Sequence, residues 1–404
     1  MTVAVIGAGA AGTMAAIFAA RTGRETLLLE GTRDGGRKIL ISGGGRCNVL
    51  PARVDESRFV TASSPATMRN MLRSWPLGEQ IAFFEGELAI PLAEETEAAK
   101  LFPRSNRARD VRDGVLREAE RSGARFLPRC RVTGLLPEGS RWRIEREGAP
   151  PLLVDQAIVA TGGRSVPTTG SDGAGLDMLK RLGHTIHPTY AALTPLTARP
   201  APFGELAGVS LRVGITARSA DETARAEGGF LFTHHGYSGP AVLDVSHVAV
   251  RSRAARVSVR WGGLGREEWE QALRPEGART VGGAVRAELP DRLAGMLLAG
   301  AGVPPATPLA QLRREDRGRL IGMLADGELP WTGDEGYKKA EVTGGGLALF
   351  EVDPRTMESR RHPGLFVCGE ALDAFGPIGG YNFLWAWATG RAAGRGAGAV
   401  SGQR

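Results

Sequence analysis

The sequence predicts an α/β fold whose first βαβ unit opens a parallel sheet that is later interrupted by an insertion. Residues 3–29 read as an apolar strand, a helix of small residues and a second apolar strand. Two further buried-strand patterns, 152–163 and 363–373, return to the same sheet. Between them, β-prone segments with turn residues over 190–260 give way to charged amphipathic helix patterns over 266–326. The chain therefore reads as an α/β domain with an inserted part whose strand and helix pattern differs from that of the α/β domain.

The composition is that of a folded globular protein. The 404 residues are 42% hydrophobic and 24% charged, which allows two domains and a large core. No stretch of eighteen uncharged apolar residues occurs, so no membrane span is expected. The opening MTVAVIGAG reads as a strand and not as a signal peptide, so we expect a cytoplasmic protein.

Cysteine usage and net charge exclude several classes of site. Cys47, Cys130 and Cys368 are scattered singly and the histidines have no metal spacing, so neither disulfides nor a metal site are expected. The formal net charge is +7 and the pI about 9.7. The arginines are nevertheless spread along the chain among acids, without aromatic partners, and a nucleic-acid partner is therefore not expected.

A dinucleotide-binding motif opens the chain. Gly7, Gly9 and Gly12 have G-x-G-x-x-G spacing between the first apolar strand and the helix. The first glycine permits a tight turn, the second lets a pyrophosphate approach backbone N–H groups, and the third lets helix and strand pack closely. The positive end of the helix dipole favours the pyrophosphate. The residues expected at the cofactor here are Gly7, Gly9, Ala10, Ala11 and Gly12.

Glu30 narrows the choice of dinucleotide. It ends the second strand, where a carboxylate suits the adenosine ribose hydroxyls and repels a 2′-phosphate, so FAD or NAD is expected and not NADP. A glycine-rich loop over 31–48 follows, about as long as a path beside an extended cofactor requires. Its triplet Gly43–Gly45 lies among apolar and specific polar residues, which is untypical of a linker. We interpret the triplet as close backbone approach to a flat ring, which favours FAD.

Several separate blocks give the chain a family resemblance. They are GRKILISGGGRCN at 36–48, FPRSNRARDV at 102–111, VATGGRSVPTTGSDGAG at 159–175, LFTHHGYSGPAVLDVS at 231–246, EVTGGG at 341–346 and the long block at 353–390. On these blocks the sequence resembles the BaiN-type (YhiN-like) NAD(P)/FAD-dependent oxidoreductases, also described as aminoacetone oxidase family FAD-binding enzymes. The resemblance runs nearly end to end.

The resemblance implies a Rossmann-like, two-dinucleotide-type FAD-binding domain with an inserted β-barrel and a small helical subdomain. The corresponding boundaries are 1–189 and 347–404 for the discontinuous FAD-binding domain, 190–262 for the barrel, and 263–346 for the helical subdomain with the return segment. No second G-x-G-x-x-G unit follows, so NADH or NADPH would bind only transiently as a reductant.

The resemblance also implies the residues that line the cofactor. Val132 would meet the adenine through its backbone, and Arg37 and Lys38 would lie near the phosphates or the adenosine, unless they are solvated loop charges. Glu370 and Asp373 compete for the ribityl hydroxyls. A helix beginning near Gly380 would aim its first N–H groups at the flavin pyrimidine. The remaining expected positions are Ser42, Gly43, Gly44, Arg46, Cys47, Asn48, Thr161, Gly162, Gly163, Gly369, Gly379, Tyr381 and Asn382.

Candidates for catalysis are few. His234, His235 and Tyr237 lie in FTHHGYSGP, where an imidazole near flavin N5 could relay a proton, although packing inside the barrel is an equal alternative. Cys47 lacks a neighbouring cysteine and reads as a small buried residue beside the cofactor. Arg46 would orient an anionic substrate or pair with the cofactor.

Three functions are compatible with the sequence. The first is an FAD-dependent oxidoreductase that uses NAD(P)H to reduce a C=C or C=N bond in a small organic substrate, or runs the dehydrogenation. The second is an amine oxidase that uses oxygen. The third is a flavin-binding module that modifies RNA or senses redox state. Neither the substrate nor the oligomeric state can be read from the sequence.

Overall fold

The computed structural model divides into two compact units, and it describes residues 1–96 and 99–399. Unit 1 comprises Met1–Tyr190 and Glu341–Arg404, and unit 2 comprises Ala191–Ala340. The sequence separates the inserted part into a barrel at 190–262 and a helical piece at 263–346. The contacts instead gather both into unit 2 and return residues 341–346 to unit 1.

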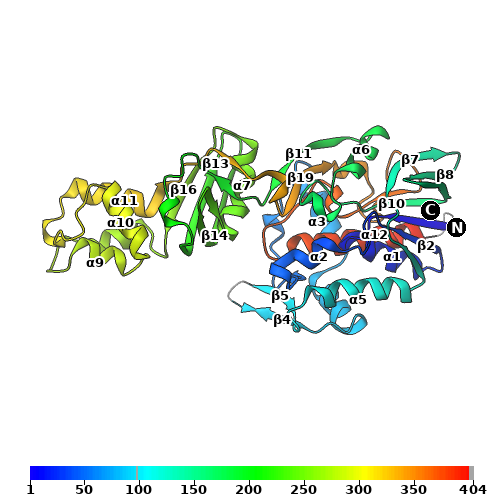
Figure 1. Ribbon diagram of the computed structural model, residues 1–404, viewed down its shortest axis with the longest axis horizontal. Coiled ribbons are helices and arrows are strands. Elements are labelled where there is room, and N and C mark those ends of the chain that lie inside the picture. The colour runs from blue at the N-terminus through cyan, green and yellow to red at the C-terminus, as the bar shows by residue number, and fades with distance from the viewer. Residues whose placement is uncertain (97–98, 400–404) are drawn as a thin grey trace. The chain divides into compact units, whose positions relative to one another are not determined.

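Unit 1 is built on a five-stranded parallel sheet with the order β20-β10-β1-β2-β6 (Figure 1). Its strands are β1 (Thr2–Ile6), β2 (Glu25–Leu29), β6 (Ala124–Leu127), β10 (Gln156–Val159) and β20 (Leu365–Val367). Adjacent strands are in parallel register throughout. The central strands β1 and β10 read as continuous apolar runs because both faces of the sheet are covered.

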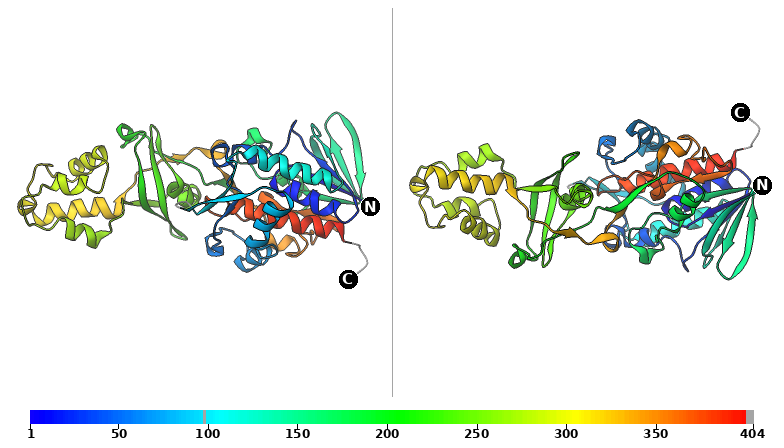
Figure 2. Two further views of the ribbon diagram at one scale, coloured as in Figure 1. Left: turned by 90° about the horizontal axis from the view of Figure 1, so that it is seen from below. Right: turned by 90° about the horizontal axis from the view of Figure 1, so that it is seen from above.

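Three helices pack together over this sheet. They are α1 (Ala10–Ala20), α5 (Ala108–Arg121) and α12 (Tyr381–Gly398), and α1 contacts both of the others (Figures 1 and 2). From β6 the chain reverses direction across the sheet to reach β10. Because such crossovers are right-handed, this connection passes over the opposite face. There it forms an antiparallel sheet of β7 (Val132–Glu138), β8 (Arg141–Arg146) and β9 (Ala149–Val154), which contacts β1 and β10.

The remaining elements of unit 1 are short. The helices are α2 (Arg37–Ile41), α3 (Pro65–Leu72), α4 (Leu77–Ala82) and α6 (Ala174–Arg181). A three-stranded sheet has the order β3-β5-β4, from β3 (Leu50–Pro51), β5 (Lys100–Pro103) and β4 (Leu92–Glu95). A two-stranded sheet pairs β11 (Ile186–Ala192) with β19 (Val342–Leu347).

Unit 2 contains a seven-stranded sheet with the order β17-β16-β13-β14-β15-β12-β18. The strands are β12 (Leu196–Thr197), β13 (Ser210–Arg218), β14 (Thr223–Thr233), β15 (Gly236–Ser238), β16 (Arg256–Trp261), β17 (Gly327–Glu328) and β18 (Gly333–Asp334). Only four residues, 329–332, separate the edge strands β17 and β18 along the chain. The two edges therefore lie within about 18 Å of each other, so the sheet curls into an incompletely closed barrel.

Five helices complete unit 2. They are α7 (Pro240–Arg251), α8 (Arg266–Ala272), α9 (Val281–Arg286), α10 (Asp291–Gly300) and α11 (Arg314–Asp326). The helix α7 packs on β13 and β14, although the sequence suggested only β structure over 190–260. Its helical periodicity is visible in Val242, Val245 and Val248, all buried, after a proline at the first helical position.

The predicted loop over 31–48 contains regular structure. Residues 37–41 form the single-turn helix α2, which begins after Gly36 in the left-handed region at φ 60°. The next residues make a tight turn, η1 (Ser42–Gly45), in which Gly43 and Gly44 are also left-handed. The run RKILI favours a helix, and the glycines end it.

Candidate functional site

The N-terminus of α1 presents bare backbone. A Cβ on Gly7 would stand 2.6 Å from the Ala160 carbonyl oxygen, and one on Gly12 only 1.8 Å from the Gly7 carbonyl oxygen. Both positions therefore require glycine for packing. A Cβ on Gly9 would meet no protein atom within 4 Å. Ala10 and Ala11 begin the helix, which has neither a side-chain cap nor an acid in its first turn. The positive end of the helix is thus left for an anion.

Glu30 is held beside this turn. Its carboxylate accepts hydrogen bonds from the backbone N–H of Ala8 at 2.9 Å and of Thr32 at 2.7 Å, and the residue is 9% exposed. The backbone of Cys130 donates to the Glu30 carbonyl at 2.7 Å, which brings the following strand to the same edge. Val132, the first residue of β7, therefore lies near the tip of β2.

The N-terminus of α12 points the same way as that of α1. Cβ atoms on Gly390 and Gly394 would each stand 2.3 Å from a carbonyl oxygen, of Ala11 and Ala15 respectively. The two helices therefore run parallel in close contact. Gly390 is level with the start of α1, so the nine residues before it carry the start of α12 about 14 Å further. This N-terminus also lacks a side-chain cap and an acidic first turn.

The loop from the first part of the chain meets the start of α12. The Asn48 side chain is oriented so that both its oxygen and its nitrogen have hydrogen-bond partners. The oxygen accepts from Gly380 N at 3.0 Å, and the nitrogen donates to the Leu50 carbonyl at 3.2 Å. A Cβ on Gly380 would stand 2.4 Å from the Leu50 carbonyl carbon. Trp387 donates to the Val49 carbonyl at 3.1 Å, which fixes the same segment against α12. Gly44 faces open space, since a Cβ there meets nothing within 4 Å.

Two side chains of this loop, Arg46 and Ser42, make their contacts with other groups of the protein. The Arg46 guanidinium pairs with Glu95 at 2.8 Å and lies over the Phe102 ring at 4.1 Å, so it anchors the loop to β4 and β5. The Ser42 hydroxyl donates to the Ile39 carbonyl at 2.8 Å.

Cys47 is fully buried, and burial raises the pKa of its thiol to about 12 even though a hydrogen bond with Ser42 lowers that pKa. Cys47 is therefore not a thiolate nucleophile.

A charged cluster lies behind the glycines at 162 and 163. Lys38 Nζ donates to Glu370 Oε2 at 2.5 Å and to the Ser165 hydroxyl at 2.6 Å. Glu370 Oε1 accepts from the Ser165 hydroxyl at 2.7 Å and from the backbone N–H of Thr343 at 3.0 Å. Burial alone would raise the pKa of Glu370, but the Lys38 charge and these hydrogen bonds outweigh burial and lower it.

The backbone around this cluster is tightly confined. A Cβ on Gly163 would stand 2.3 Å from the Thr343 hydroxyl, and one on Gly162 would stand 2.7 Å from the Ser171 hydroxyl. The Thr161 hydroxyl is buried without a hydrogen-bond partner among the described residues. A buried hydroxyl of this kind is a ready donor for a bound group. Arg37, by contrast, pairs with Asp34 at 3.0 Å on the surface.

Asp373, the other acid expected at the ribityl hydroxyls, is buried against residues 62 and 63. Its Oδ2 accepts from the backbone N–H groups of Ala62 and Ser63 and from the Ser63 hydroxyl at 2.8 to 3.0 Å, and it is 2% exposed. His187 Nε2 lies 3.7 Å from the same oxygen. Burial raises the pKa of Asp373 despite these donors. Of the two acids, only Glu370 lies beside Gly162 and Gly163.

Other expected residues shape the loop before α12. Gly369 donates its N–H to the Thr389 hydroxyl at 3.0 Å. The Asn382 side chain accepts from and donates to the Gly376 backbone, both at 2.9 Å, so its amide supports the loop. The Tyr381 hydroxyl donates to the Arg53 carbonyl at 3.1 Å. Gly379 is left-handed at φ 123° and borders Lys100.

The catalytic candidates all belong to unit 2. Tyr237 is 1% exposed, lies among Phe203, Phe230 and Phe232, and donates its hydroxyl to the Pro330 carbonyl at 2.9 Å. Burial also raises the pKa of its phenol. Tyr237 is therefore packed as a core residue of unit 2. His234 and His235 are exposed at the two-residue turn between β14 and β15.

Ser165, Thr343, Ser63 and His187 join the polar clusters although the sequence did not single them out. Ser165 and Thr343 do occur in the blocks at 159–175 and 341–346 that carry the family resemblance. Nothing local marks Ser63 or His187. Among residues 1–96 and 99–399, no group of His, Cys, Asp or Glu side chains is arranged to hold a metal. In the same part of the chain, no helix has the length and apolar character needed to cross a membrane.

Comparisons with known proteins agree with this architecture. Residues 1–396 match the family described as HI0933-like protein Rossmann domain. The chain is 32% identical over 392 residues to the ribosomal RNA dihydrouridine synthase of Escherichia coli, covering 95% of each chain. It is 31% identical over 407 residues to the 3-dehydro-bile acid delta(4,6)-reductase of Clostridium scindens, covering 98% of each. The open conformation of a flavocytochrome c3 fumarate reductase shares the fold with a TM-score of 0.50 at 15% identity, over 98% of this chain and 78% of that one.

The βαβ unit and the interrupted parallel sheet form a dinucleotide-binding fold, and the family match and the relatives identify the class of protein as FAD-dependent oxidoreductase. Within that class, the chain belongs to the HI0933-like family, as the match over residues 1–396 shows. The family resemblance, the fold class and the enzyme class expected from the sequence are confirmed.

Proposed function

We propose that the protein reduces a carbon–carbon double bond conjugated to a carbonyl in a small organic substrate, with NADH or NADPH as the electron donor. Two relatives of nearly equal similarity support this proposal by their names, a dihydrouridine synthase and a bile acid reductase. Uracil and an unsaturated 3-oxo steroid both contain such a double bond. The chemistry that the two names share is therefore the addition of a hydride and a proton across an electron-poor C=C bond.

The observation that carries the proposal is the pair of parallel helices α1 and α12, which are in close contact at Gly390 and Gly394 and leave both N-termini uncapped by side chains. We assign the pyrophosphate of FAD to the start of α1 and the isoalloxazine to the start of α12, since the start of α12 lies about 14 Å further along the same direction. When bound, FAD supplies two-electron hydride chemistry at its N5. Gly9 and Gly44 fit that cofactor, since neither would place a Cβ against protein.

In this arrangement, residues of the chain would bind FAD and hold it in a fixed orientation. The Glu30 carboxylate would accept hydrogen bonds from the ribose hydroxyls on the lone pairs that the backbone N–H groups of Ala8 and Thr32 do not use. The Thr161 hydroxyl, which has no partner among the described residues, would donate a hydrogen bond to the cofactor. The Lys38–Glu370 pair would lie along the ribityl and pyrophosphate segment. The first N–H groups of α12 favour negative charge on the pyrimidine by about 0.3–2 kcal/mol.

His234 and His235 remain the candidates for proton delivery that the sequence indicates. Both are exposed on the two-residue turn between β14 and β15, and an imidazole ring can donate or accept a hydrogen-bonded proton. In net terms the substrate would gain a hydride on one carbon of the double bond and a proton on the other, and NAD(P)H would supply the hydride and become NAD(P)⁺.

Anaerobic rapid mixing tests the proposal. Protein loaded with FAD is mixed with NADH or NADPH, and the flavin absorbance is followed before and after addition of a conjugated enone. We expect bleaching by one of the nucleotides and recovery of the absorbance on adding the enone. Bleaching only by amines, with recovery only in oxygen, would instead identify an amine oxidase.

A further inference from the structure

Lys100 of unit 1 is a half-buried cation without an acidic partner. It is the first residue of β5, where it lies opposite Pro51 of β3 on one side and Glu95 of β4 on the other. The Glu95 carboxylate, however, pairs with Arg46 at 2.8 Å. Among the described residues, no ion pair or hydrogen bond involves the Lys100 ammonium. A charge that is partly removed from water in this way favours a partner from outside the chain.

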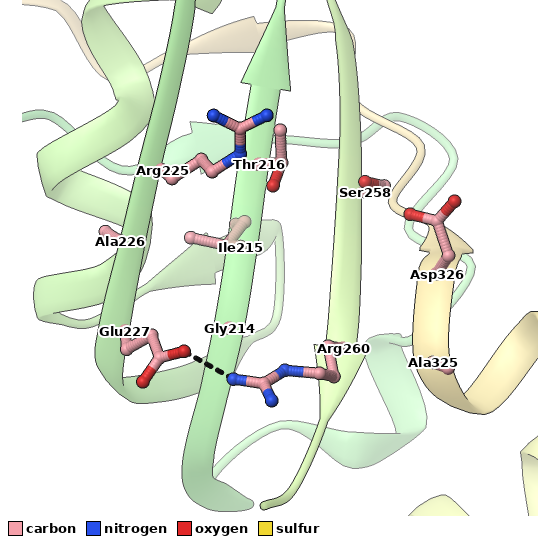
Figure 3. A pocket seen from close by; sticks show the side chains of 10 residues that line it. All are labelled: Gly214, Ile215, Thr216, Arg225, Ala226, Glu227, Ser258, Arg260, Ala325 and Asp326. Carbon is pink, nitrogen blue, oxygen red and sulfur yellow. Dashed lines mark hydrogen bonds and ion pairs between the residues drawn. The ribbon is translucent and has the colours of Figure 1, made fainter. Parts of the chain in front are cut away.

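The cation Arg260 shows the more usual arrangement. In a hollow on the sheet of unit 2, its guanidinium passes over Gly214 and pairs with Glu227 at 2.5 Å (Figure 3). A charge-assisted contact of this kind satisfies both groups within the protein. Lys100 has no such acid, so its charge is available to a bound group.

The Lys100 side chain runs along the loop before α12. A Cβ on Gly379 would stand 3.8 Å from Lys100 Cγ and 3.6 Å from Lys100 Cε, so the stem lies against this glycine. The ammonium nitrogen is one bond beyond Cε and therefore lies within about 5 Å of the same point. Gly379 comes two residues before Tyr381, the first residue of α12. The cation thus lies beside the positive end of this helix.

The same face of β5 meets the glycine turn η1. Side chains two residues apart in a strand share a face, so Phe102 lies on the same side of β5 as Lys100. A Cβ on Gly43 would stand 3.0 Å from the Phe102 ring. One face of β5 therefore borders both segments that the sequence places at the flavin, the turn at 42–45 and the loop before α12.

The electrostatics beside Gly379 favour an anion. The start of α12 carries a partial positive charge and no acid, and a cation next to it is unfavourable unless a negative group compensates both. Glu341 is an acid within reach of the Lys100 charge. Burial raises the pKa of the Glu341 carboxyl, and the positive charges of Lys38 and Lys100 only partly offset this effect. An acid that is biased towards its neutral form compensates little of the Lys100 charge.

We propose that Lys100 stabilises the negative charge that reduction leaves on the isoalloxazine, with its ammonium directed at N1 and the C2 carbonyl oxygen of the pyrimidine. Transfer of a hydride from NADH or NADPH to N5 moves two electrons and one proton, which adds one negative charge to the ring and leaves NAD(P)⁺. An ammonium beside that charge favours the reduced over the oxidised cofactor and raises the flavin potential. The role of Lys100 rests on the proposed function, which assigns the isoalloxazine to the start of α12, but it does not depend on the substrate.

Sulfite affinity and flavin potential both report this charge in the FAD-loaded protein. Sulfite adds to N5 and leaves the same negative charge on the pyrimidine, so a cation near N1 tightens its binding. The test variant is Lys100→Met, which keeps the stem and removes the charge, and Lys100→Arg restores a cation. The matched control is Lys180→Met, which makes the same change at an exposed lysine of α6. Melting temperature and FAD content show that each variant is folded.

We expect Lys100→Met to weaken sulfite binding at least tenfold and to lower the two-electron potential by about 30 mV or more, the equivalent of a tenfold change. Lys100→Arg and Lys180→Met should keep a sulfite affinity within threefold of that of the unmodified protein. An unchanged affinity and potential in Lys100→Met, or an equal loss in Lys180→Met, would overturn the proposal. A raised KM for the enone at an unchanged potential would assign Lys100 to the substrate and overturn it as well.

The proposal can also be tested if Lys100→Met does not retain FAD. Lys100→Gln is then measured under the same criteria, and in the unmodified protein a flavin potential below that of free FAD would contradict a cation at N1. Neither measurement needs a nicotinamide nucleotide, since dithionite reduces the flavin. A potential that depends on Lys100, in a flavin that neither NADH nor NADPH bleaches, would support the role of Lys100 and contradict the proposed electron donor.

Discussion

Gly390 of α12 lies directly against Ala11 of α1, so that a Cβ on Gly390 would stand 2.3 Å from the Ala11 carbonyl oxygen. The contact joins the first helix of the chain to the last one, and Gly394 repeats it one turn later against Ala15. Both helix N-termini assigned to the cofactor depend on this parallel approach. The spacing of the two helix N-termini is thus set by two glycines in the middle of α12.

Substitution of Gly390 by alanine should destabilise unit 1. The new methyl would meet backbone atoms, which cannot move aside like a flexible side chain, so the helices must separate at a cost of about 1–3 kcal/mol. A fall of about 2–9 °C in melting temperature is expected, together with loss of bound FAD. The control is Gly322→Ala in α11, where a Cβ meets nothing within 4 Å and helix propensity improves. Equal melting temperatures for the two variants would contradict the close packing.

Gly9→Ala should separate cofactor binding from folding. Gly9 has φ −79°, which alanine adopts, and the added methyl touches no protein atom. The melting temperature of the apoprotein should therefore change little, whereas FAD affinity should fall at least tenfold, about 1.4 kcal/mol, because the methyl occupies the space of the pyrophosphate. Calorimetric titration with FAD measures the affinity. Gly78→Ala, equally free of contacts, serves as the control. Unchanged FAD affinity in Gly9→Ala would place the pyrophosphate elsewhere.

The sequence was sufficient for features that depend on local spacing. The strand–helix–strand start, the strands β10 and β20 and the beginning of α12 were all predicted, since apolar runs and glycine spacing act over a few residues. Tyr237 shows the limit of such reasoning. In the pattern HHGY it looks titratable, but the register of β15 sets it opposite Phe232 and Leu196 inside the sheet.

Interactions between distant residues could not be predicted. Lys38 and Glu370 are 332 positions apart, and nothing in either local segment indicates their ion pair. The arginines illustrate the same limit at the surface. Arg218 and Arg256 look dispersed among acids in the sequence, and only antiparallel register makes them neighbours.

The Lys38–Glu370 pair should show strong coupling in a double-mutant cycle. Lys38→Met leaves the Glu370 carboxylate without its counterion, and Glu370→Gln leaves the Lys38 ammonium without its counterion. Because each remaining charge lies in a confined place, each variant should lower the free energy of unfolding and of FAD binding by about 2–4 kcal/mol. The double variant should cost less than the sum, with a coupling energy of about 1–3 kcal/mol. Urea unfolding and FAD titration supply the values. Simple additivity would show that the two charges act independently.

Only Cys130 should react with thiol reagents in the native protein. Burial raises the pKa of Cys47 to about 12 and also raises the pKa of Cys368, and both are 0% exposed, whereas Cys130 is half-buried. Iodoacetamide at pH 8 should therefore give a single adduct, and Cys130→Ser should remove it. Cys47→Ser should keep the flavin reducible by the same nucleotide. A rapid adduct on Cys47, detected by peptide mass spectrometry, would contradict its burial.

Acid should destabilise unit 1 through Glu351. Its carboxylate accepts from Arg361 Nε at 2.6 Å, from Thr185 N at 3.0 Å and contacts His184 Nδ1 at 3.0 Å, while its side chain is 2% exposed. Burial would raise the pKa of Glu351, but these partners outweigh burial and hold it at about 2. The stabilisation is therefore present above the ordinary glutamate pKa and is lost as the pH falls from about 4.5 to 2, by up to about 3 kcal/mol.

His184 acts in the same direction at higher pH. Burial lowers its pKa, despite the neighbouring Glu351, so stability should begin to fall below about pH 6.5 as the unfolded chain takes up a proton that the folded protein resists. Glu351→Gln should remove most of the loss below pH 4.5 and already cost about 2 kcal/mol at pH 7, because Arg361 loses its carboxylate. Urea unfolding free energies at pH 7, 5, 4 and 3 measure both effects. Glu276→Gln, an exposed carboxyl in unit 2, is the control, and an identical pH profile for the two variants would rule out this network as the acid-sensitive element.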